Sequence, residues 1–530
     1  MSDEPQRPAS KDDPNVWKAY WTVQSMPWRT EPEIDEQRQR YLAQRRAVQP
    51  DVEKSVYPFR DENGSIRLTR ADVEWLLATH RYGGIVGPVD WEAEKGREAS
   101  QRRLGVDLRG ADLRDTDLSG LPLASIRGGL RADGRRGTSP EHRDKAGVRL
   151  EGAVLRGTHL ENARLRGAHL ERAVLSAAHL QCAVLSHANL QGASLGFVHL
   201  EGADLDAADL EGVGLGFAHL EGATLRGAHA EGAHIPNAHL ERADLTRADF
   251  MNANLYGAHL EAAELNEALL GGADLGEAHL EGANLHVAQL EGADLTRAYF
   301  DNQTYLSSVA LGGTRTRTPR LRSAVGPAAK VRDVHWGGVD LTLVRWGQLL
   351  RLGDEQQART HKDADGDRKP RVIRELEFEN AARANRQLAA ALRTQGLIDD
   401  ADRFAYRAQL CQRRLLRLQR HYLRYLGSLF LWLIAGYGYK PLRSFIAYVI
   451  IIIISAFAGA YLLNAQFAAR HLTWDEALVL SISAFHGRGF FTSGISLGDT
   501  LARLAAGEAI IGLLIEITFI ATFTQRFFAR

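Results

Sequence analysis

The chain has few of the residues that mark a disulfide-bonded domain or a metal-binding motif. Its 530 residues include only two cysteines, Cys182 and Cys411, and these stand alone, so we expect neither a disulfide framework nor a CxxC metal site. The N-terminus, "MSDEPQRPASKDDPNVW", lacks an apolar stretch, which argues against a cleavable signal peptide. Basic and acidic residues both number 65, so the composition indicates no nucleic-acid partner. A nucleophile–base arrangement, a P-loop and a metal motif are also missing, and we therefore predict no enzyme, no cofactor and no metal.

A five-residue period takes the place of these motifs. Leucines recur every fifth residue from Leu108 to Leu123, and a polar insertion occupies residues 124–147. The period resumes at Leu150 and holds to Phe300, with Leu, Phe or Ile at every fifth position except Ala230, and almost always Ala two places earlier. Neither 3.6 nor 2 divides five, so the pattern is neither a long helix nor an ordinary strand. Two inward side chains in five residues suit a square coil, with one pentapeptide on each side.

Segments such as "EGADLDAADLEG" and "EGANLHVAQLEGADLTRA" resemble the pentapeptide-repeat family, whose A(D/N)LXX units build a right-handed quadrilateral β-helix. This resemblance implies a pentapeptide-repeat solenoid over residues 101–310. About seven coils, spaced about 4.8 Å apart, would make a rod about 35 Å long. The family's fold says little about function.

Positions twenty residues apart should stack on one side of such a coil. One column of these positions consists of histidines: His159, His179, His199, His219, His239, His259 and His279. Two places further on, the same coils carry Glu, or Gln in one case, from Glu161 to Glu281. One hypothesis is a pH-responsive or partner-binding face, and the alternative is a ladder inherited by duplication of a twenty-residue unit. A metal ladder is not expected, because neighbours in one column do not make a tetrahedral site.

The segments outside the repeat predict further domains. Residues 1–100 suggest a mixed capping domain, and residues 311–370 suggest one degenerate coil followed by a linker. Residues 371–425 have helical periodicity with Gly396 between two halves, and resemble a tetratricopeptide-type helical hairpin. Residues 426–530 resemble a membrane domain.

Two apolar segments in that last region have the length of membrane spans. Residues 444–463 are uncharged, and the only charged residues in 504–525 are Glu508 and Glu516. The Arg-rich segment before the first span places the N-terminal domains and the C-terminus in the cytoplasm of a multi-pass cell-membrane protein. The GYG motif at 436–438 precedes the first span, so we interpret it as an interfacial elbow rather than an ion filter. Its anchoring residues are Tyr437, Tyr439, Lys440 and Arg443.

A third apolar segment between the two spans predicts a short re-entrant helix over residues 474–485, followed by a glycine-punctuated loop. This order resembles the two-span potassium-channel-like pore region, which implies four subunits around one pore. The resemblance places the inner helix at Glu508, Gly512 and Glu516. It places the filter loop at Phe485, His486, Gly487, Arg488, Gly489, Phe490 and Phe491. The threonine and tyrosine of the potassium filter are missing there, and Arg488 opposes cations, so standard potassium selectivity is not expected.

The leading prediction from these patterns is a homotetrameric, ion-channel-like membrane protein with a large cytoplasmic repeat domain that senses or scaffolds. Its partners would be membrane lipid, ions, further copies of the chain and a protein on the repeat rod. The alternative is a non-conducting, membrane-anchored protein-interaction scaffold. A remote alternative is a DNA-mimicking, gyrase-binding protein, which would need an acidic rod surface.

Overall fold

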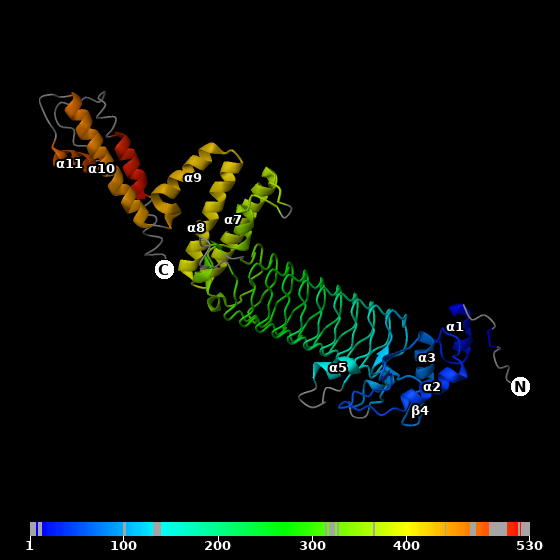
Figure 1. Ribbon diagram of the computed structural model, residues 1–530. Helices are drawn as coiled ribbons and strands as arrows, with labels where there is room; N and C mark the ends of the chain where they lie inside the picture. Colours follow the sequence, from blue (N-terminus) through cyan, green and yellow to red (C-terminus); the bar gives the residue numbers. More distant parts are fainter. Residues whose placement is uncertain are drawn as a thin grey trace. The chain divides into compact units, whose positions relative to one another are not determined.

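The computed structural model describes residues 7–8, 13–98, 102–130, 139–312, 315–316, 324–325, 328–363, 366–439, 441–466, 473–486, 506–517 and 520. The chain forms two compact units, Met1–Gln356 and Gln357–Arg530. Figure 1 draws both, and each is described by itself below.

The first unit begins with short helices and strands ahead of the repeat. In chain order they are α1 (Pro14–Val23), α2 (Glu36–Arg46), β1 (Arg60–Asp61), β2 (Gly64–Arg67), α3 (Arg70–Ala78), β3 (Arg81–Tyr82), β4 (Ile85–Val86) and α4 (Trp91–Glu94). Strand β2 pairs in parallel with β5 (Ala111–Asp112), which belongs to the first coil, with Ile66 opposite Ala111. Because this pairing extends the ladder of the coil, the backbone groups of its first edge find hydrogen-bond partners.

The repeat forms a four-sided parallel β-helix, in which one pentapeptide makes each side. One residue on each side of the coil pairs with the residue twenty positions further along the chain, as His159 pairs with His179 and Arg164 pairs with Val184. The amide of Leu160 donates to the carbonyl of His179 at 2.7 Å, and the amide of His179 donates back to Thr158 at 2.9 Å. Figure 1 shows the resulting stack of coils from cyan to green. The twenty-residue step is therefore a full turn of the coil.

Two positions of each pentapeptide make the core, and a third makes the corner. Leu160 and Ala163 are fully buried, like their equivalents along the stack. The corner residue, two places after the leucine, takes a left-handed backbone conformation, as in Gly202 (φ +64°) and Cys182 (φ +57°). Glycine adopts this conformation without strain. The inward and corner positions thus account for the period of five.

The twenty-residue step is interrupted at both ends of the stack. Asp112 pairs with Arg149, so the chain between them, which includes α5 (Pro140–Ala146), leaves the coil. Near the other end, Asp294 pairs with Lys330 and Tyr299 pairs with His335; β6 (Arg315–Thr316) and β7 (Ala324–Val325) lie in the intervening segment. The 3₁₀ helices η1 (Leu341–Leu343) and η2 (Trp346–Gln348) follow. Insertions are therefore accommodated as excursions, and the coil then resumes its register.

The second unit is helical, and α6 (Gly353–Arg359) contains the boundary between the units. Its helices are α7 (Arg371–Thr394), α8 (Ile398–Leu418), α9 (Tyr422–Ala435), α10 (Pro441–Gln466) and α11 (Trp474–Phe485), with the 3₁₀ turn η3 (Gly436–Gly438), and residues 506–517 are also helical. Helices α7 and α8 lie side by side (Figure 1). Phe378, Ala381 and Cys411 belong to their shared core, and the chain reverses at Gly396 (φ +77°).

The predicted membrane spans are wrong. Among the described residues, no helix combines the length and the apolar character needed to cross a membrane. Of residues 504–525, the structure describes a continuous helix over 506–517. The same finding contradicts the predicted multi-pass membrane localisation and the cytoplasmic placement derived from it.

Candidate interaction surface on the repeat domain

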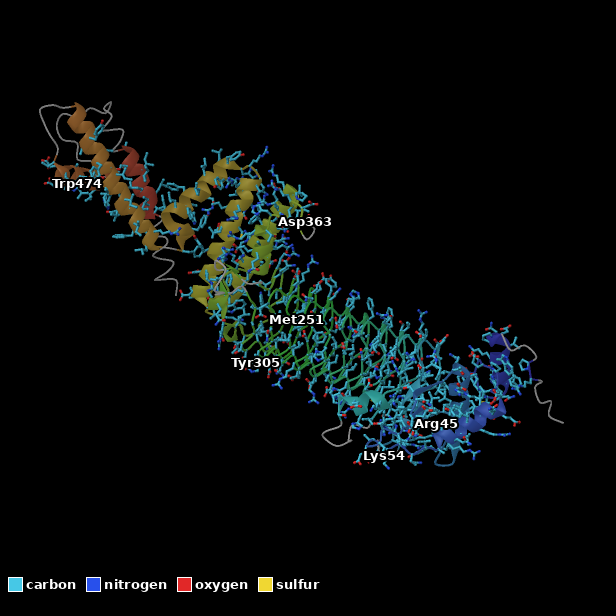
Figure 2. All side chains as sticks on the ribbon, in the orientation of Figure 1. Arg45, Lys54, Met251, Tyr305, Asp363 and Trp474 are labelled. Carbon is cyan, nitrogen blue, oxygen red and sulfur yellow. The ribbon has the colours of Figure 1, made fainter. Side chains whose placement is uncertain are left out.

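The histidine column forms a continuous stack of rings along one side of the coil. Neighbouring imidazoles from His159 to His279 have centroids 4.8 to 5.0 Å apart, with planes within 6° of parallel. The stack continues through Tyr299 and His335, at 4.6 and 4.5 Å. These distances equal the spacing of neighbouring strands, so each ring lies over the preceding one. Figure 2 shows side chains projecting along the whole repeat.

Six of the seven imidazoles contact a glutamate two residues further on. The Nδ1–Oε1 distance is 2.9 Å for His159 and Glu161 and increases to 3.4 Å for His279 and Glu281. Because a carboxylate accepts, Nδ1–H is the donor in each pair. The bond to Glu161 raises the pKa of His159. His179 faces Gln181 instead, and burial, followed by repulsion from His159, lowers its pKa.

The second oxygen of each of these glutamates is buried. Among the described residues, Oε2 of Glu161, Glu201, Glu221, Glu241, Glu261 and Glu281 has no hydrogen-bond partner. A buried acceptor without a partner is unfavourable. Each of these carboxylates therefore accepts from an adjacent imidazole through Oε1, while its Oε2 lacks a partner among the described residues.

Several of these side chains form groups that offer nitrogen and oxygen atoms to a metal. They are His239, Glu241 and His259; Glu201, His219 and Glu221; Glu261, His279 and Glu281; and, on another side, Glu151, His169 and Glu171. Within a group the ligand atoms lie up to 4.8 Å apart. Tetrahedral zinc with bonds of about 2.0 Å needs its ligand atoms about 3.3 Å apart. The rings would therefore have to leave the stack, and the geometry fits a hydrogen-bonded ladder better than a metal site.

Two exposed phenylalanines beside the column were not among the predicted site residues. Phe197 and Phe217 are 61% and 48% exposed, and their rings stack with centroids 5.3 Å apart. Both occupy corners with left-handed backbone (φ +58° and +57°), where glycine would be free of strain. Each lies two residues before a histidine of the column, in "GFVHLEG" and "GFAHLEG". A bulky aromatic residue at two successive corner positions is the sequence signal that could have revealed them.

The predicted inner-helix residues pack against α11. Glu508 is buried and hydrogen-bonded to Ser481, whose hydroxyl also lies 3.0 Å from the carbonyl oxygen of Ile452. Burial raises the pKa of Glu508. A Cβ at Gly512 would collide with the carbonyl oxygen of Phe485, so close packing explains this glycine. Oε1 of Glu516 lies 3.4 Å from Nε2 of His486.

The predicted filter loop lies mostly outside the described residues. Phe485 and His486 end α11, while Gly487, Arg488, Gly489, Phe490 and Phe491 are not described. A pore domain of the predicted kind needs helices that span the membrane. Since the described chain contains no such helix, the ion-channel prediction is wrong.

The predicted elbow residues contact other side chains of the second unit. The hydroxyl of Tyr437 is 2.7 Å from Oγ of Ser428, and the rings of Tyr437 and Tyr439 lie 6.2 and 6.3 Å from Tyr406 of α8. The guanidinium of Arg443 lies 5.3 Å from the ring of Trp432. Lys440 is outside the described residues. The described residues of the elbow thus join α8, α9 and α10.

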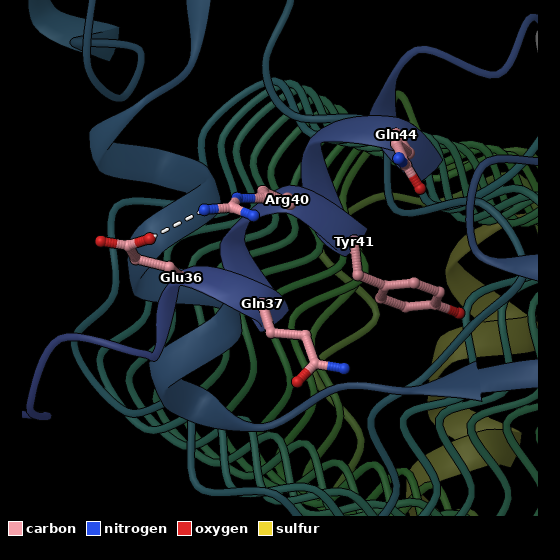
Figure 3. Close-up of a pocket in the computed structure, with 5 residues that line it drawn as sticks. All are labelled: Glu36, Gln37, Arg40, Tyr41 and Gln44. Carbon is pink, nitrogen blue, oxygen red and sulfur yellow. Dashed lines mark hydrogen bonds and ion pairs between the residues drawn. The ribbon is translucent and has the colours of Figure 1, made fainter.

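A hollow on the surface of α2, in the first unit, lacks the features of a binding site. Its volume is about 480 Å³, and Glu36, Gln37, Arg40, Tyr41 and Gln44 line it (Figure 3). All five come from one helix, and Arg40 is already paired with Glu36 at 2.9 Å. A surface made by one helix with a satisfied ion pair does not define a binding site.

The coil defines this chain's first unit as a four-sided β-helical solenoid with short capping elements. Residues 146–302 match the model of the pentapeptide repeats family, in 8 copies over residues 146–181, 168–206, 188–227, 225–261 and 263–302. The repeat region is therefore a pentapeptide-repeat domain, as its resemblance to the family implied. No curated protein matches the chain significantly.

Several solved pentapeptide-repeat structures are similar to parts of the chain. HetL from the cyanobacterium Nostoc sp. strain PCC 7120 is 28% identical, covers 41% of this chain and 91% of its own, and has a TM-score of 0.19. A trypsin-treated variant of QnrB1, a plasmid-mediated fluoroquinolone resistance protein, is 17% identical. The match covers 37% of this chain and 84% of QnrB1, with a TM-score of 0.26. Another pentapeptide-repeat protein from Nostoc PCC 7120 is 34% identical. The match covers 23% of this chain and 72% of that protein, with a TM-score of 0.08. The family match supports the pentapeptide-repeat part of the sequence resemblance. The potassium-channel-like part has no support from the comparisons, and neither has the homotetramer, which depends on that part.

Proposed function

We propose that this chain is a non-enzymatic scaffold whose repeat domain binds another protein. The observation that carries the proposal is the exposed pair Phe197 and Phe217. Large aromatic side chains are enriched among the residues that dominate binding energy at protein interfaces. Holding two of them exposed, at corners where a side chain is strained, is unfavourable for the isolated coil. A partner that covers both rings would offset that cost.

The surroundings of the pair indicate the chemistry of the partner. Gly196, Gly214 and Gly216 leave the adjoining side of the coil with few side chains, Ser194 among them, so another backbone can approach closely. The next side of the same coils carries His199 and His219 of the histidine column, which contact the carboxylates of Glu201 and Glu221. We therefore expect a protein segment with an apolar anchor for the phenylalanines and flanking Lys or Arg side chains.

The remote alternative, a DNA mimic, has less support on the other sides of the rod. Arginines there pair with acidic residues of the neighbouring coil: Arg226 with Asp206 at 2.9 Å, and Arg297 with Glu277 at 2.7 Å. A surface of paired charges lacks the continuous negative field by which a protein would imitate DNA.

Site-specific photocrosslinking tests the proposal. A photoreactive residue replaces Phe217 in one full-length variant and Ala207 in a control. Ala207 lies at the opposite corner of a neighbouring coil and shares the left-handed backbone (φ +54°). We expect a protein crosslinked from position 217 and not from 207, and we expect the purified partner to bind the native chain.

The Phe197→Ser, Phe217→Ser double variant should then lose at least about tenfold in affinity, as loss of an aromatic hot spot does. Equal crosslinking from both positions, or unchanged affinity in the double variant, would contradict the proposal. Crosslinking only to a second copy of the chain would show that this surface mediates self-association instead of binding a different protein.

A further inference from the structure

The second unit contains a cavity whose wall is strongly basic. Its volume is about 630 Å³, within the range of about 300 to 1,000 Å³ typical of small-ligand sites. Six arginines from α7, α8 and the turn after α8 contribute to its lining: Arg371, Arg374, Arg413, Arg414, Arg417 and Arg420. None of the described residues that line it is acidic. The cavity thus concentrates positive charge in a place large enough for a small molecule.

The six arginines differ in the contacts they make within the described part of the chain. Arg371 is paired with Glu375 at 2.6 Å. Arg413 and Arg414 lie over aromatic rings, at 4.4 Å from Trp432 and 5.9 Å from Phe378. These ring contacts orient the two side chains but leave their positive charge in place.

Three arginines have no acidic partner in the described part of the chain, namely Arg374, Arg417 and Arg420. Glu377, the next acidic residue after Glu375 on the same helix, is already paired with Lys369 at 2.5 Å. Two buried donors, Nε of Arg374 and Nη1 of Arg413, find no acceptor among the described residues. Unpaired buried donors are unfavourable, and neighbouring guanidinium groups repel one another. An anion with several oxygens would relieve both effects.

The helix ends at the cavity add to this preference. Arg371 and Arg374 stand in the first turn of α7, and Tyr422 and Tyr425 stand in the first turn of α9; all four line the cavity. Free backbone N–H groups and the helix dipole favour anions at such ends. The last turn of α8 has the opposite polarity, and Arg417 offsets it there.

We propose that this cavity binds a small molecule that carries two or more phosphate groups. Guanidinium forks match the geometry of phosphate oxygens and bind them in bidentate fashion. A single carboxylate or chloride ion would neutralise only one of the cations. Tyr422 and Tyr425 provide aromatic wall on which the planar part of a nucleotide could pack. Since the lining comes from α7, α8 and α9, a bound polyphosphate would also hold these helices together.

Isothermal titration calorimetry on the full-length chain, in buffer of low ionic strength, tests this site. Inorganic tripolyphosphate and a nucleoside triphosphate are the two probes. Binding of both with equal affinity would show that the phosphates alone are recognised, and tighter binding of the nucleotide would show a contribution from the base. Either result supports the proposal. Failure of both probes to bind would overturn it.

Paired variants distinguish the cavity from general surface charge. We expect Arg374→Gln, Arg417→Gln to weaken binding of tripolyphosphate at least about tenfold, because two charge-assisted contacts are lost. Arg386→Gln removes an exposed arginine of α7 outside the cavity and should change affinity less than about twofold. Arg374→Lys, Arg417→Lys keeps the charge and loses the forks, so its affinity should lie between those of the other two. Equal losses in the cavity and control variants would refute the site, and circular dichroism checks that each variant remains helical.

Discussion

The pair Ala230 and Phe250 tests how the core of the coil is packed. Ala230 is the one small residue at a position that otherwise holds Leu, Ile or Phe, and it is fully buried. Phe250, larger than leucine and also buried, lies one coil further on, because His229 pairs with Asp249. The next positions of this column, Leu210 and Leu270, have the usual size. We infer that the ring of Phe250 fills the space left by Ala230.

This inference sets the expected free energies of unfolding. Phe250→Leu removes up to three buried carbons and leaves a void, so it should lower the free energy of unfolding by about 1 to 2 kcal/mol. Ala230→Leu inserts a side chain into space already filled and should cost about 1 to 3 kcal/mol. The double variant restores two residues of ordinary size and should lie within about 1 kcal/mol of the native chain. Independent effects would instead add to about 2 to 5 kcal/mol.

Hydrogen exchange provides the assay, because stability in a repeat array is partly local. The amides of Ala230 and Phe250 donate to Asp249 and Leu269, both at 2.7 Å, so their protection reports opening of these coils. Leu170→Ala in the same column is the control, and it should cost about 2 to 5 kcal/mol as an ordinary core truncation. A double variant whose loss equals the sum of the two single losses would refute the complementary packing.

Three further substitutions test other features. Gln181→Glu should raise the pKa of His179, measured by NMR titration of its imidazole, because the new carboxylate would accept from Nδ1–H as in the neighbouring coils; an unchanged pKa would contradict the ladder. Asp354 has a pKa raised from 3.8 to about 6 by burial, so the folded chain holds its proton over a range in which the unfolded chain has lost it. The free energy of unfolding should therefore fall by about 3 kcal/mol as pH rises from about 4 to about 6. Asp354→Asn should flatten that part of the pH profile in denaturant unfolding, and an equally steep profile in the variant would contradict the assignment to Asp354. Gly512→Ala should lower the melting temperature of the second unit, since its Cβ would collide with the carbonyl oxygen of Phe485, and an unaltered melting curve would show that this contact is loose.

Where sequence reasoning failed, the feature depended on contacts between distant segments. The apolar residues after Arg443 have the composition of a membrane span. In the structure Ile452 shares a buried cluster with Ile434, Phe485 and Ile515, whereas Ile446, Ile450 and Ile454 are exposed. Hydropathy records the apolar character of a segment alone, whereas the contacts that its side chains make depend on residues far away in the sequence. Likewise, the arginines from Arg413 to Arg420 match the positive flank of a span in sequence, whereas the structure brings them to the start of α7 around one cavity.

The sequence by itself determined the coil, its core of leucine and alanine, and the stacking of residues twenty apart. Each pentapeptide has almost the same neighbours as the next, so its environment can be derived from the repeat alone. Only the tertiary structure decided how β2 extends the first coil and that six arginines from separate segments surround one cavity. These features arise where the repeat ends or is broken, and there the partners of a residue are set by the folded chain rather than by its position in the period.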